Sequence, residues 1–571
     1  MENSGFIKKK YYGMLFAYLF SWFVATFGDL ADGILAGILI SEEAVAAVEL
    51  VAPVFSVLMF FSGFVAVGVS TLFVRSMGAF DKKSAYRICG TGLMAAVFIG
   101  IVLAAAMYIF EDAFFGFYTS TAVIDGLARE YYECLILLAL IYPLYWLIYY
   151  LVAADGNPFL CFIATTVNAA SNAIFSCLLV SHLGIKGLGL GTVIALLAGG
   201  ATMIIHFFRK SNSVRVIMKI DLKRLVEASA VGSASSFIYL YIGIVDIIIN
   251  KFLIVHFGDT YLSAYMVVNL VLNLVGCFTS AAAAAGPFVS VGYGEKNPLA
   301  IKNIMNFSTV PISVIGVVFS AIVFFAAPLL PQMYGITGPE VFDSAVYAGR
   351  VLGISYLATC FVMHWINYLP RINCVLHSNV LAAVYLFISP LVFPMPFAIW
   401  WGFKGLVWGF FLTPIVAFLY HFIYVAVKYG LKKFPYMVPE TDNRVFIHGL
   451  TLNTSEIMRL RDEVERDLSS CGVSADIINK AQLVIEESFQ IVRDKNPGAE
   501  ISGDCTVIVS DSYVRLITRD NGIIFDITDA NAKIKSLREY MNACLNESGL
   551  ESTYLTTTTF NRNSYIWELN K

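Results

Sequence analysis

Ionisable side chains inside long apolar stretches are the residues of this chain best suited to carry chemistry. Asp29 and Asp32 lie three positions apart in the first stretch, so both can face one side of a helix. Asp246 stands near Asn250 and Lys251 in a later stretch. An ionisable group is costly inside a membrane, so its presence there indicates a function. A carboxylate in a partly dry cavity can exchange a proton near neutral pH, or bind sodium together with neighbouring oxygens.

Polar pairs at helical spacing accompany these acids, and several have a structural alternative. Asn168 and Asn172 are four apart, and His364 and Asn367 are three apart. The two asparagines could simply form hydrogen bonds between helices, as polar residues in membrane helices often do. Asp32 could cap a helix end. Lys251 could pair with Asp246 and leave a purely structural ion pair.

The elements that position these residues are predicted to be membrane helices. Apolar residues make up 58% of the 571-residue chain and charged residues only 14%, against about 25% charged in soluble domains. Charged residues concentrate after Lys432, so a soluble tail follows a membrane domain. The formal net charge of −3 gives no indication of nucleic-acid binding. The ten cysteines include no C-x-x-C pair, so neither a metal site nor a catalytic site is predicted from them.

Twelve apolar windows are long enough to cross a hydrocarbon core of about 30 Å. They lie at 14–40, 45–76, 88–110, 131–154, 158–181, 187–208, 228–256, 260–292, 304–328, 343–368, 374–398 and 402–427. Lysines and arginines fall in the loops of one side, including the longest loop, 209–224, whereas the opposite loops are acidic. This asymmetry predicts a plasma-membrane protein with both termini in the cytoplasm.

The chain also repeats itself. The pattern G-x-K-G-L-x-x-G occurs at residues 184–191 and again 218 residues later at 402–409. Gly78 and Gly294 form a second echo, because each opens a short polar loop before a new apolar stretch. Two similar halves in a membrane are typical of secondary transporters. We therefore predict an all-α membrane domain of two six-helix lobes, 1–215 and 216–433, then a linker, 434–449, and a tail domain, 450–571.

The membrane domain, over roughly residues 10–430, resembles the multidrug and toxic compound extrusion (MATE) family. The resemblance is carried by Asp32-Gly33, the run Ala44 to Val48, Pro53, the run Gly68 to Ser70 and Asp155-Gly156-Asn157-Pro158. It implies a two-lobed antiporter that expels small organic cations or drugs and admits protons or sodium. The 45 Phe and 30 Tyr could contact flat cationic compounds, although membrane lipids and the interfaces account for most of them.

The resemblance also implies a cation-coupling site in the first lobe. By position its members are Asp32, Asn172, Ser176 and Thr192, with Asp29 as an alternative acid and Asp246 as an acid of the second lobe. Ser176 departs from the family, which commonly has Asp there. One carboxylate in place of two weakens a sodium site, because hard cations prefer charged oxygen ligands.

The tail is predicted to be an α+β sandwich. Helices are expected at 456–471 and 475–494, a hairpin over 504–518 turning at Asp511-Ser512, a helix at 532–546, and strands at 552–560 and 563–569. This order, with Glu486 and the run Asp520 to Asp526, resembles the GHKL ATP-binding fold of the anti-sigma-factor kinase type. The resemblance implies that Glu486 activates water or orients magnesium, and that Asp520, in an Asp-x-Gly motif with Gly522, holds the adenine amino group.

Two departures argue against hydrolysis in the tail. Gln490 stands where the family has a metal-binding Asn, and residues 529–546 lack the glycines of a phosphate-binding lid. We therefore expect a degenerate domain that binds ATP and magnesium weakly, docks a cytoplasmic protein partner, or gates the membrane domain.

Three function classes stay open on the sequence. They are a cation-coupled exporter of small organic compounds without enzyme activity, a flippase for a lipid-linked or polysaccharide precursor, and a membrane-tethered regulator acting through its tail. Acids in the first span favour the exporter, whereas a cavity lined by several arginines would favour the flippase.

Overall fold

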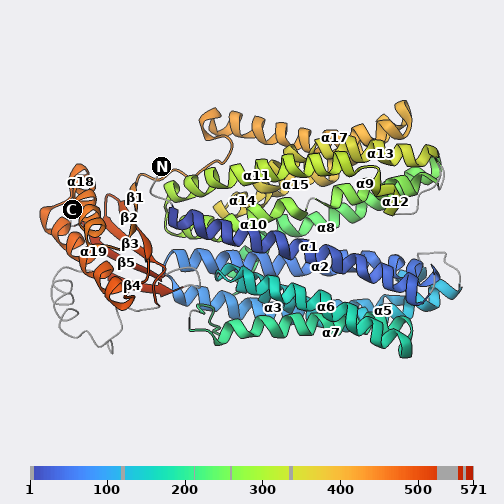
Figure 1. Cartoon of the computed structure of the whole chain (residues 1–571), viewed down its shortest axis with the longest axis horizontal. Coiled ribbons are helices and arrows are strands. Elements are labelled where there is room, and N and C mark those ends of the chain that lie inside the picture. The colour runs from blue at the N-terminus through green and yellow to red at the C-terminus, as the bar shows by residue number, and fades with distance from the viewer. Residues whose placement is uncertain are drawn as a thin grey trace.

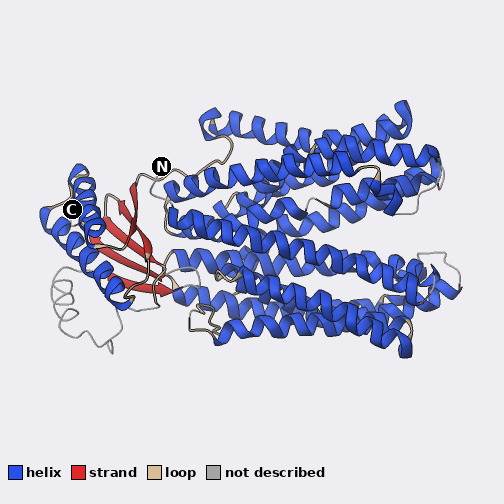
Figure 2. Ribbon diagram, viewed as in Figure 1, coloured by secondary structure: helices blue, strands red, loops and turns tan. Residues whose placement is uncertain are grey.

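The computed structural model of the chain describes residues 5–569 except 41, 117–121, 211, 258–259, 275, 334–338, 524–550 and 557–560. A long helical bundle carries a small sheet domain against one end (Figure 1). We call this sheet domain, residues 444–569, the tail, and the end of the bundle that contacts it the tail end. Figure 2 shows that the bundle is helical throughout and that the strands belong to the tail.

The first lobe holds the helices that precede residue 209. They are α1 (Gly5–Leu39), α2 (Glu42–Gly78), α3 (Lys82–Ile109), the short α4 (Glu111–Gly116), α5 (Ala122–Ala154), α6 (Pro158–Leu183), α7 (Ile185–Ile204) and the 3-10 turn η2 (Ile205–Phe208). The second lobe begins at α8 (Leu222–Phe257) and continues through α9 (Thr260–Asn273), α10 (Gly276–Gly294), α11 (Pro298–Ala326), α12 (Leu329–Met333), α13 (Pro339–Ile354), α14 (Tyr356–Tyr368), η3 (Leu369–Ile372), α15 (Val375–Ala383), the π-helical η4 (Val384–Ile388), α16 (Ser389–Val392), α17 (Pro394–Tyr429) and η5 (Leu431–Lys433).

Each predicted span coincides with a helix or a run of consecutive helices. Within the described residues, eight helices are long and apolar enough to cross a membrane singly, and two bent pairs bring the number to as many as ten. The two predicted spans that are not among these ten are 14–40, which corresponds to α1, and 260–292, which is divided between α9 and α10. The predicted span 343–368 is one of the bent pairs, because α13 and α14 bend by 55°.

The sequence repeat corresponds to a structural repeat. Gly184 (φ 56°, ψ −137°) starts α7, and Gly402 (φ 65°, ψ −155°) kinks α17 in the same left-handed region, which glycine adopts without strain. A Cβ on Gly187 would overlap the backbone of Leu179, and one on Gly405 would overlap that of Phe397. Both pairs are related by the 218-residue offset, so each copy of the motif lets two helices pack with their backbones in contact.

The two lobes have separate apolar cores. One buried cluster centres on α10, α11, α13, α14 and α17 of the second lobe, and another on α2, α5, α6 and α7 of the first. Helix α1 joins both, because Tyr11 and Met14 pack into the second-lobe cluster whereas Ala36 packs into the first.

The described residues of the tail form a five-stranded antiparallel sheet with two helices on one face. Its elements are β1 (Arg444–Thr451), α18 (Thr454–Ser470), α19 (Ala475–Lys495), β2 (Ser502–Val509), β3 (Tyr513–Asp520), β4 (Glu551–Thr556) and β5 (Asn561–Glu568), in the order β1-β2-β3-β5-β4. The two predicted helices, the hairpin and the closing strands are present within one to three residues at most ends. The predicted helix 532–546 lies outside the described residues.

The segment predicted as a linker, 434–449, is more ordered than expected. Its second half forms strand β1, which pairs with β2 from Arg444 opposite Val509 to Thr451 opposite Ser502. Its first half packs on the second lobe, where Tyr436 and Met437 are buried in the apolar cluster and His421 Nε2 lies 2.9 Å from the carbonyl oxygen of Pro435. The prolines of this segment indicated a linker, whereas the structure shows two apolar anchors followed by a strand.

Candidate functional site

A cavity of about 390 Å³ lies between the two lobes. Its volume falls in the range of roughly 300–1,000 Å³ that is usual for small-molecule sites. Aromatic side chains from both lobes line it, namely Trp22, Trp146 and Tyr150 from the first and Tyr239, Tyr265 and Tyr385 from the second. The sequence could not identify these among so many aromatic residues, because helix packing decides which of them face inward.

Arg371 brings a positive charge to this cavity. It belongs to the 3-10 turn η3, where the chain passes from α14 to α15, and Asn373 with φ 68° completes the break. Asn367, which the sequence paired with His364, also lines the cavity, whereas His364 lies deeper and its Nε2 is 3.1 Å from Ser308 Oγ.

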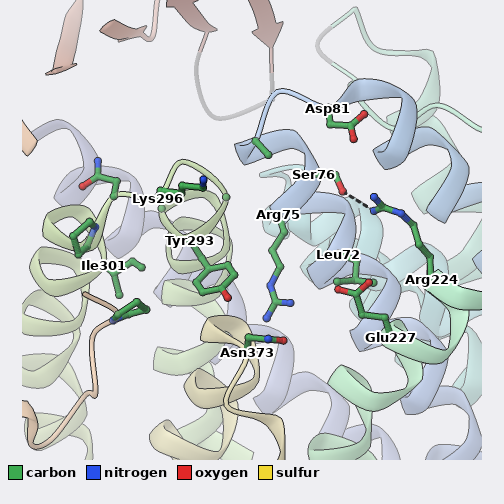
Figure 3. Close-up of a pocket in the computed structure, with 16 residues that line it drawn as sticks. Leu72, Arg75, Ser76, Asp81, Arg224, Glu227, Tyr293, Lys296, Ile301 and Asn373 are labelled. Atoms are coloured by element: carbon green, nitrogen blue, oxygen red, sulfur yellow. Dashed lines mark hydrogen bonds between the residues drawn. The ribbon is translucent and has the colours of Figure 1, made fainter. Parts of the chain in front are cut away.

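A second cavity, of about 450 Å³, opens at the tail end, and several charged side chains line it (Figure 3). Arg75 and Tyr293 face each other across it, and the Arg75 guanidinium lies 5.0 Å from the Tyr293 ring centre. Arg224 donates to Ser76 Oγ at 3.3 Å. Glu227 and Lys296 also line this second cavity, so it has both acidic and basic side chains in its wall.

Arg75 lies at the boundary between the second cavity and the central cavity. Its Nε donates to the carbonyl oxygen of Arg371 at 3.1 Å, and its Nη2 donates to the carbonyl oxygen of Pro370. An arginine of the first lobe therefore holds the backbone of the second lobe at the boundary of the central cavity.

The lobes also meet through glycines in the tail-end halves of their helices. A Cβ on Gly68 of α2 would overlap the carbonyl of Ala228 of α8, and a Cβ on Gly232 of α8 would overlap the backbone at Phe64 of α2. Such small residues let membrane helices approach closely. The two lobes are therefore held together at the tail end.

Three of the predicted coupling residues come together between α6 and α7. Ser176 Oγ donates to Asn172 Oδ1 at 3.1 Å, and Thr192 Oγ1 donates to the same oxygen at 3.4 Å. Asn172 and Ser176 are buried, and Gly191 approaches Ser176 so closely that it has no room for a side chain. The cluster brings three neutral oxygens together, and its role in cation coupling stays a prediction.

The acids predicted to complete the site are placed by their helices only. Asp29 and Asp32 belong to α1, which packs on α6, and Asp246 belongs to α8, where its neighbour Val245 lines the central cavity. The side chains of Asp29, Asp32 and Asp246 lie outside the described part of the structure, so their role stays a prediction.

The motif Asp155-Gly156-Asn157-Pro158 has a structural function that the sequence did not reveal. Asp155 is buried, and its Oδ2 lies 2.8 Å from His206 Nε2 and accepts a 3.1 Å bond from the amide of Ser213. Asn157 Nδ2 lies 3.2 Å from His206 Nδ1. The motif thus anchors the loop between the lobes to the first lobe.

The predicted nucleotide residues of the tail belong to different elements, because Asp520 ends β3 whereas Glu486 and Gln490 lie in α19. Asp520 Oδ1 accepts bonds from Asn561 Nδ2, at the start of β5, at 2.8 Å and from the Gly522 amide at 3.0 Å, so this oxygen is hydrogen-bonded within the tail. Burial raises the pKa of Asp520 to about 6 against these two opposing hydrogen bonds. Glu486 is half exposed and lies 3.6 Å from Arg461, and Gln490 lies one turn further along α19.

The opposite face of the tail sheet carries arginines that bind the bundle. Glu295, in the turn after α10, is buried between Arg519 Nη2 and Arg562 Nη2, each at 2.5 Å. Burial alone would raise the pKa of Glu295, but the charges of Arg519 and Arg562 outweigh it and hold that pKa below its usual range. The sequence analysis missed this site, because its partners lie more than 220 residues apart.

The same arginine face also contacts the first lobe. Arg562 donates to the carbonyl oxygens of Met77 at 3.2 Å and Gly78 at 3.4 Å, where α2 ends. The guanidinium groups of Arg515 and Arg562 both lie 4.6 Å from the ring centre of Phe80. Arg562 therefore joins a first-lobe turn and a second-lobe turn.

Known proteins share this architecture. Over 401 residues the chain is 21% identical to the multidrug export protein MepA of Staphylococcus haemolyticus, which covers 69% of this chain and 87% of that protein. It is 24% identical to MepA of Staphylococcus aureus strain MRSA252 over 234 residues, 40% of this chain and 52% of that protein, so the match spans about half of that relative.

Solved structures show the same fold. A crystal structure of MATE in complex with MaL6 matches with a TM-score of 0.69 at 21% identity, over 75% of this chain and 98% of that chain. An outward-facing multidrug resistance MATE transporter matches with a TM-score of 0.69 at 20% identity, over 75% and 97%. The MatE family model matches residues 17–178 and 233–398, one segment in each lobe. The chain therefore belongs to the MatE family of membrane transporters.

Proposed function

We propose that the chain exports small organic compounds across the plasma membrane as a cation-coupled antiporter, through movement of one lobe against the other. The observation that carries this proposal is the aromatic cavity between the lobes, lined from both sides. The multidrug export names of the MepA relatives and the MatE match support it. A secondary transporter of this kind does its work by binding and rearrangement and makes no covalent change in its substrate.

We propose that the described structure is the outward-facing state, from which the substrate leaves. The lobes meet at the tail end through Arg75 and the glycines of α2 and α8. The basic loops lie at that end, which by the asymmetry of lysines and arginines is cytoplasmic. The termini are accordingly both cytoplasmic, and labelling of a tag at residue 571 from outside intact cells would contradict this orientation.

For coupling, we propose that a proton on Asp32 drives the cycle. The Asn172, Ser176 and Thr192 oxygens are neutral, which leaves one carboxylate of the family site and disfavours a bare sodium ion. Proton binding on Asp32 would remove a charge from the first lobe and change its interactions with the second lobe.

For the tail, we propose a regulatory role without hydrolysis. Arg562 holds a turn of each lobe at once, so a docked tail stabilises the tail-end-closed state. The hydrogen bonds of Asp520 within the tail and the absence of an Asn at position 490 argue against a working ATP site. Weak ATP binding, or a cytoplasmic protein partner, would act by releasing the docked face.

The deciding experiment is efflux of a dye panel from proteoliposomes, with pH and sodium gradients imposed separately. Export driven by a pH gradient alone is expected. Export driven only by sodium would replace the proton proposal, and the absence of any export would contradict the exporter. Calorimetric titration of the tail with ATP and magnesium, followed by a phosphate-release assay, tests the regulator: turnover that disappears in Glu486→Ala would contradict a degenerate domain.

A further inference from the structure

The central cavity has an uneven charge. Among the described residues that line it, Arg371 is the one with a formal charge, and none is a carboxylate. The rest of the described lining is aromatic, aliphatic or neutral polar. A cavity built for organic cations would be expected to present carboxylates and electron-rich rings, whereas the described lining of this cavity presents rings and a guanidinium.

The guanidinium of Arg371 is held in place, but not all of its N–H donors have a hydrogen-bond partner among the described residues. Arg371 Nη1 has a long 3.5 Å contact to Ser290 Oγ, and its Nε has no hydrogen-bond partner among the described residues. A buried donor without a partner costs about 1–3 kcal/mol. An anionic ligand group would satisfy it, since a guanidinium binds a carboxylate or phosphate through two parallel hydrogen bonds.

The surroundings hold this guanidinium in place. A Cβ added to Gly286 of α10 would overlap Arg371 Cζ, so the arginine lies flat on a helix surface that only glycine leaves free. The backbone of Arg371 is held separately, because Arg75 Nε donates a 3.1 Å hydrogen bond to the carbonyl oxygen of Arg371. A side chain held on both sides, yet with donors unused, is typical of a binding group.

We propose that Arg371 binds an anionic group of the transported compound, so that the substrates are amphipathic organic anions or zwitterions with an aromatic body. This inference rests on the proposed export function and narrows its substrate class from the cations expected on the sequence. Tyr150 and Trp146 of the first lobe would contact the aromatic body, while Arg371 of the second lobe holds the charge. Substrate would thus bind both lobes at once.

The test uses a pair of dyes that differ in one group. Rhodamine 110 has a free carboxylate, and rhodamine 123 is its methyl ester. Binding to the purified full chain in neutral detergent is followed by quenching of tryptophan fluorescence, to which Trp22 and Trp146 of the cavity contribute. Rhodamine 110 is expected to bind about tenfold more tightly or better, as for a hydrogen bond to a charged group.

Variants assign this preference to the arginine. Arg371→Gln should abolish the preference, Arg371→Lys should retain part of it, and Gly286→Ala should weaken it by displacing the guanidinium. Arg350→Gln removes an exposed arginine of the same lobe and should leave the ratio unchanged. Equal affinity for the two dyes, or a preference that persists in both Arg371→Gln and Gly286→Ala, would overturn the inference.

Two further arms exclude other occupants of the guanidinium. Addition of phosphatidylglycerol to the micelles should not displace rhodamine 110; displacement would assign the site to a lipid headgroup and overturn the substrate class. The double variant Arg371→Asp with Asp246→Arg exchanges the two charges. If it restores both the dye preference and the stability, Arg371 pairs with Asp246 inside the protein, and the inference is overturned. Because binding is measured without transport, selective binding without export would contradict the proposed function and leave this inference standing.

Discussion

Gly78 and Gly294 are equivalent residues at the ends of α2 and α10, and each packs against the backbone of the other's helix. A Cβ on Gly78 would lie 2.6 Å from the carbonyl oxygen of Val291, and one on Gly294 would overlap that of Arg75. Residues 75 and 291 differ by 216, as do 78 and 294. The contact is therefore reciprocal across the axis that relates the two lobes.

This reciprocal contact predicts that Gly294→Ala opens the tail end. The new methyl group would collide with backbone, which cannot rotate away, so α2 and α10 must separate. Spin labels at the exposed positions Lys83 and Lys302 should report a longer distance population by pulsed electron resonance. Gly13→Ala, where nothing lies within 4 Å of the added carbon, is the control. An unchanged distance distribution would contradict the prediction.

Glu295→Gln is expected to undock the tail. The substitution leaves Arg519 and Arg562 buried without their shared carboxylate, and loss of one partner from a buried ion pair typically costs about 3–5 kcal/mol. Protease cleavage of the segment 438–443 should accelerate. Glu440→Gln, which removes an exposed carboxylate paired with Lys433, should not have this effect. Equal cleavage of the two variants would show that the ion pairs do not hold the tail.

Asp32→Asn is expected to abolish efflux driven by a pH gradient while folding and dye binding persist, because the amide cannot exchange a proton. Efflux and binding measured in the same proteoliposomes separate the two effects. Loss of coupling in Asp29→Asn or Asp246→Asn, with Asp32→Asn unaffected, would transfer the role to that acid.

The pKa of Asp520 predicts a pH dependence of tail stability. Its folded pKa of about 6 lies above the unfolded value of about 3.9, so folding favours the protonated form. The stabilisation is fully present below about pH 4 and is lost as pH rises through about 6. Thermal unfolding of the tail should show this fall, and Asp520→Asn, which keeps an acceptor oxygen for Gly522, should flatten it. An equal slope in both proteins would contradict the assignment.

The parts of the fold with local patterns were predictable. Apolar windows predicted the helices, and the repeated glycines predicted the equivalence of Gly184 and Gly402. The alternation of residues along β2, β3 and β5 also separates an apolar face of the sheet from a face that carries arginines. Cys505, Val507, Leu516 and Tyr565 belong to the core under the helices, whereas the alternate positions include Arg515, Arg519 and Arg562. A sheet with one arginine face predicts a partner for that face.

The long-range contacts were not predictable from one sequence. The pairing of Glu295 with Arg519 and Arg562, and of Arg75 with the turn at Pro370, joins residues separated by more than 220 positions. The alternation in the strands predicts that the arginine face has a partner, but no local pattern shows which charge or turn of the bundle that partner is. The strand at Arg444–Thr451 was missed for a simpler reason, since the prolines before it indicated a linker.

The closure at Arg75 uses main-chain oxygens of the opposite lobe, and this has a consequence for evolution. Any amino acid at position 371 supplies the same carbonyl, so the closure survives replacement of the side chain that faces the cavity. A lineage could therefore exchange the charge in its cavity, and with it the compounds it recognises, in a single substitution that leaves the gate intact. On the proposed function, residue 371 contributes to selectivity through its side chain and to closure of the tail end through its carbonyl oxygen, and the two roles can vary independently.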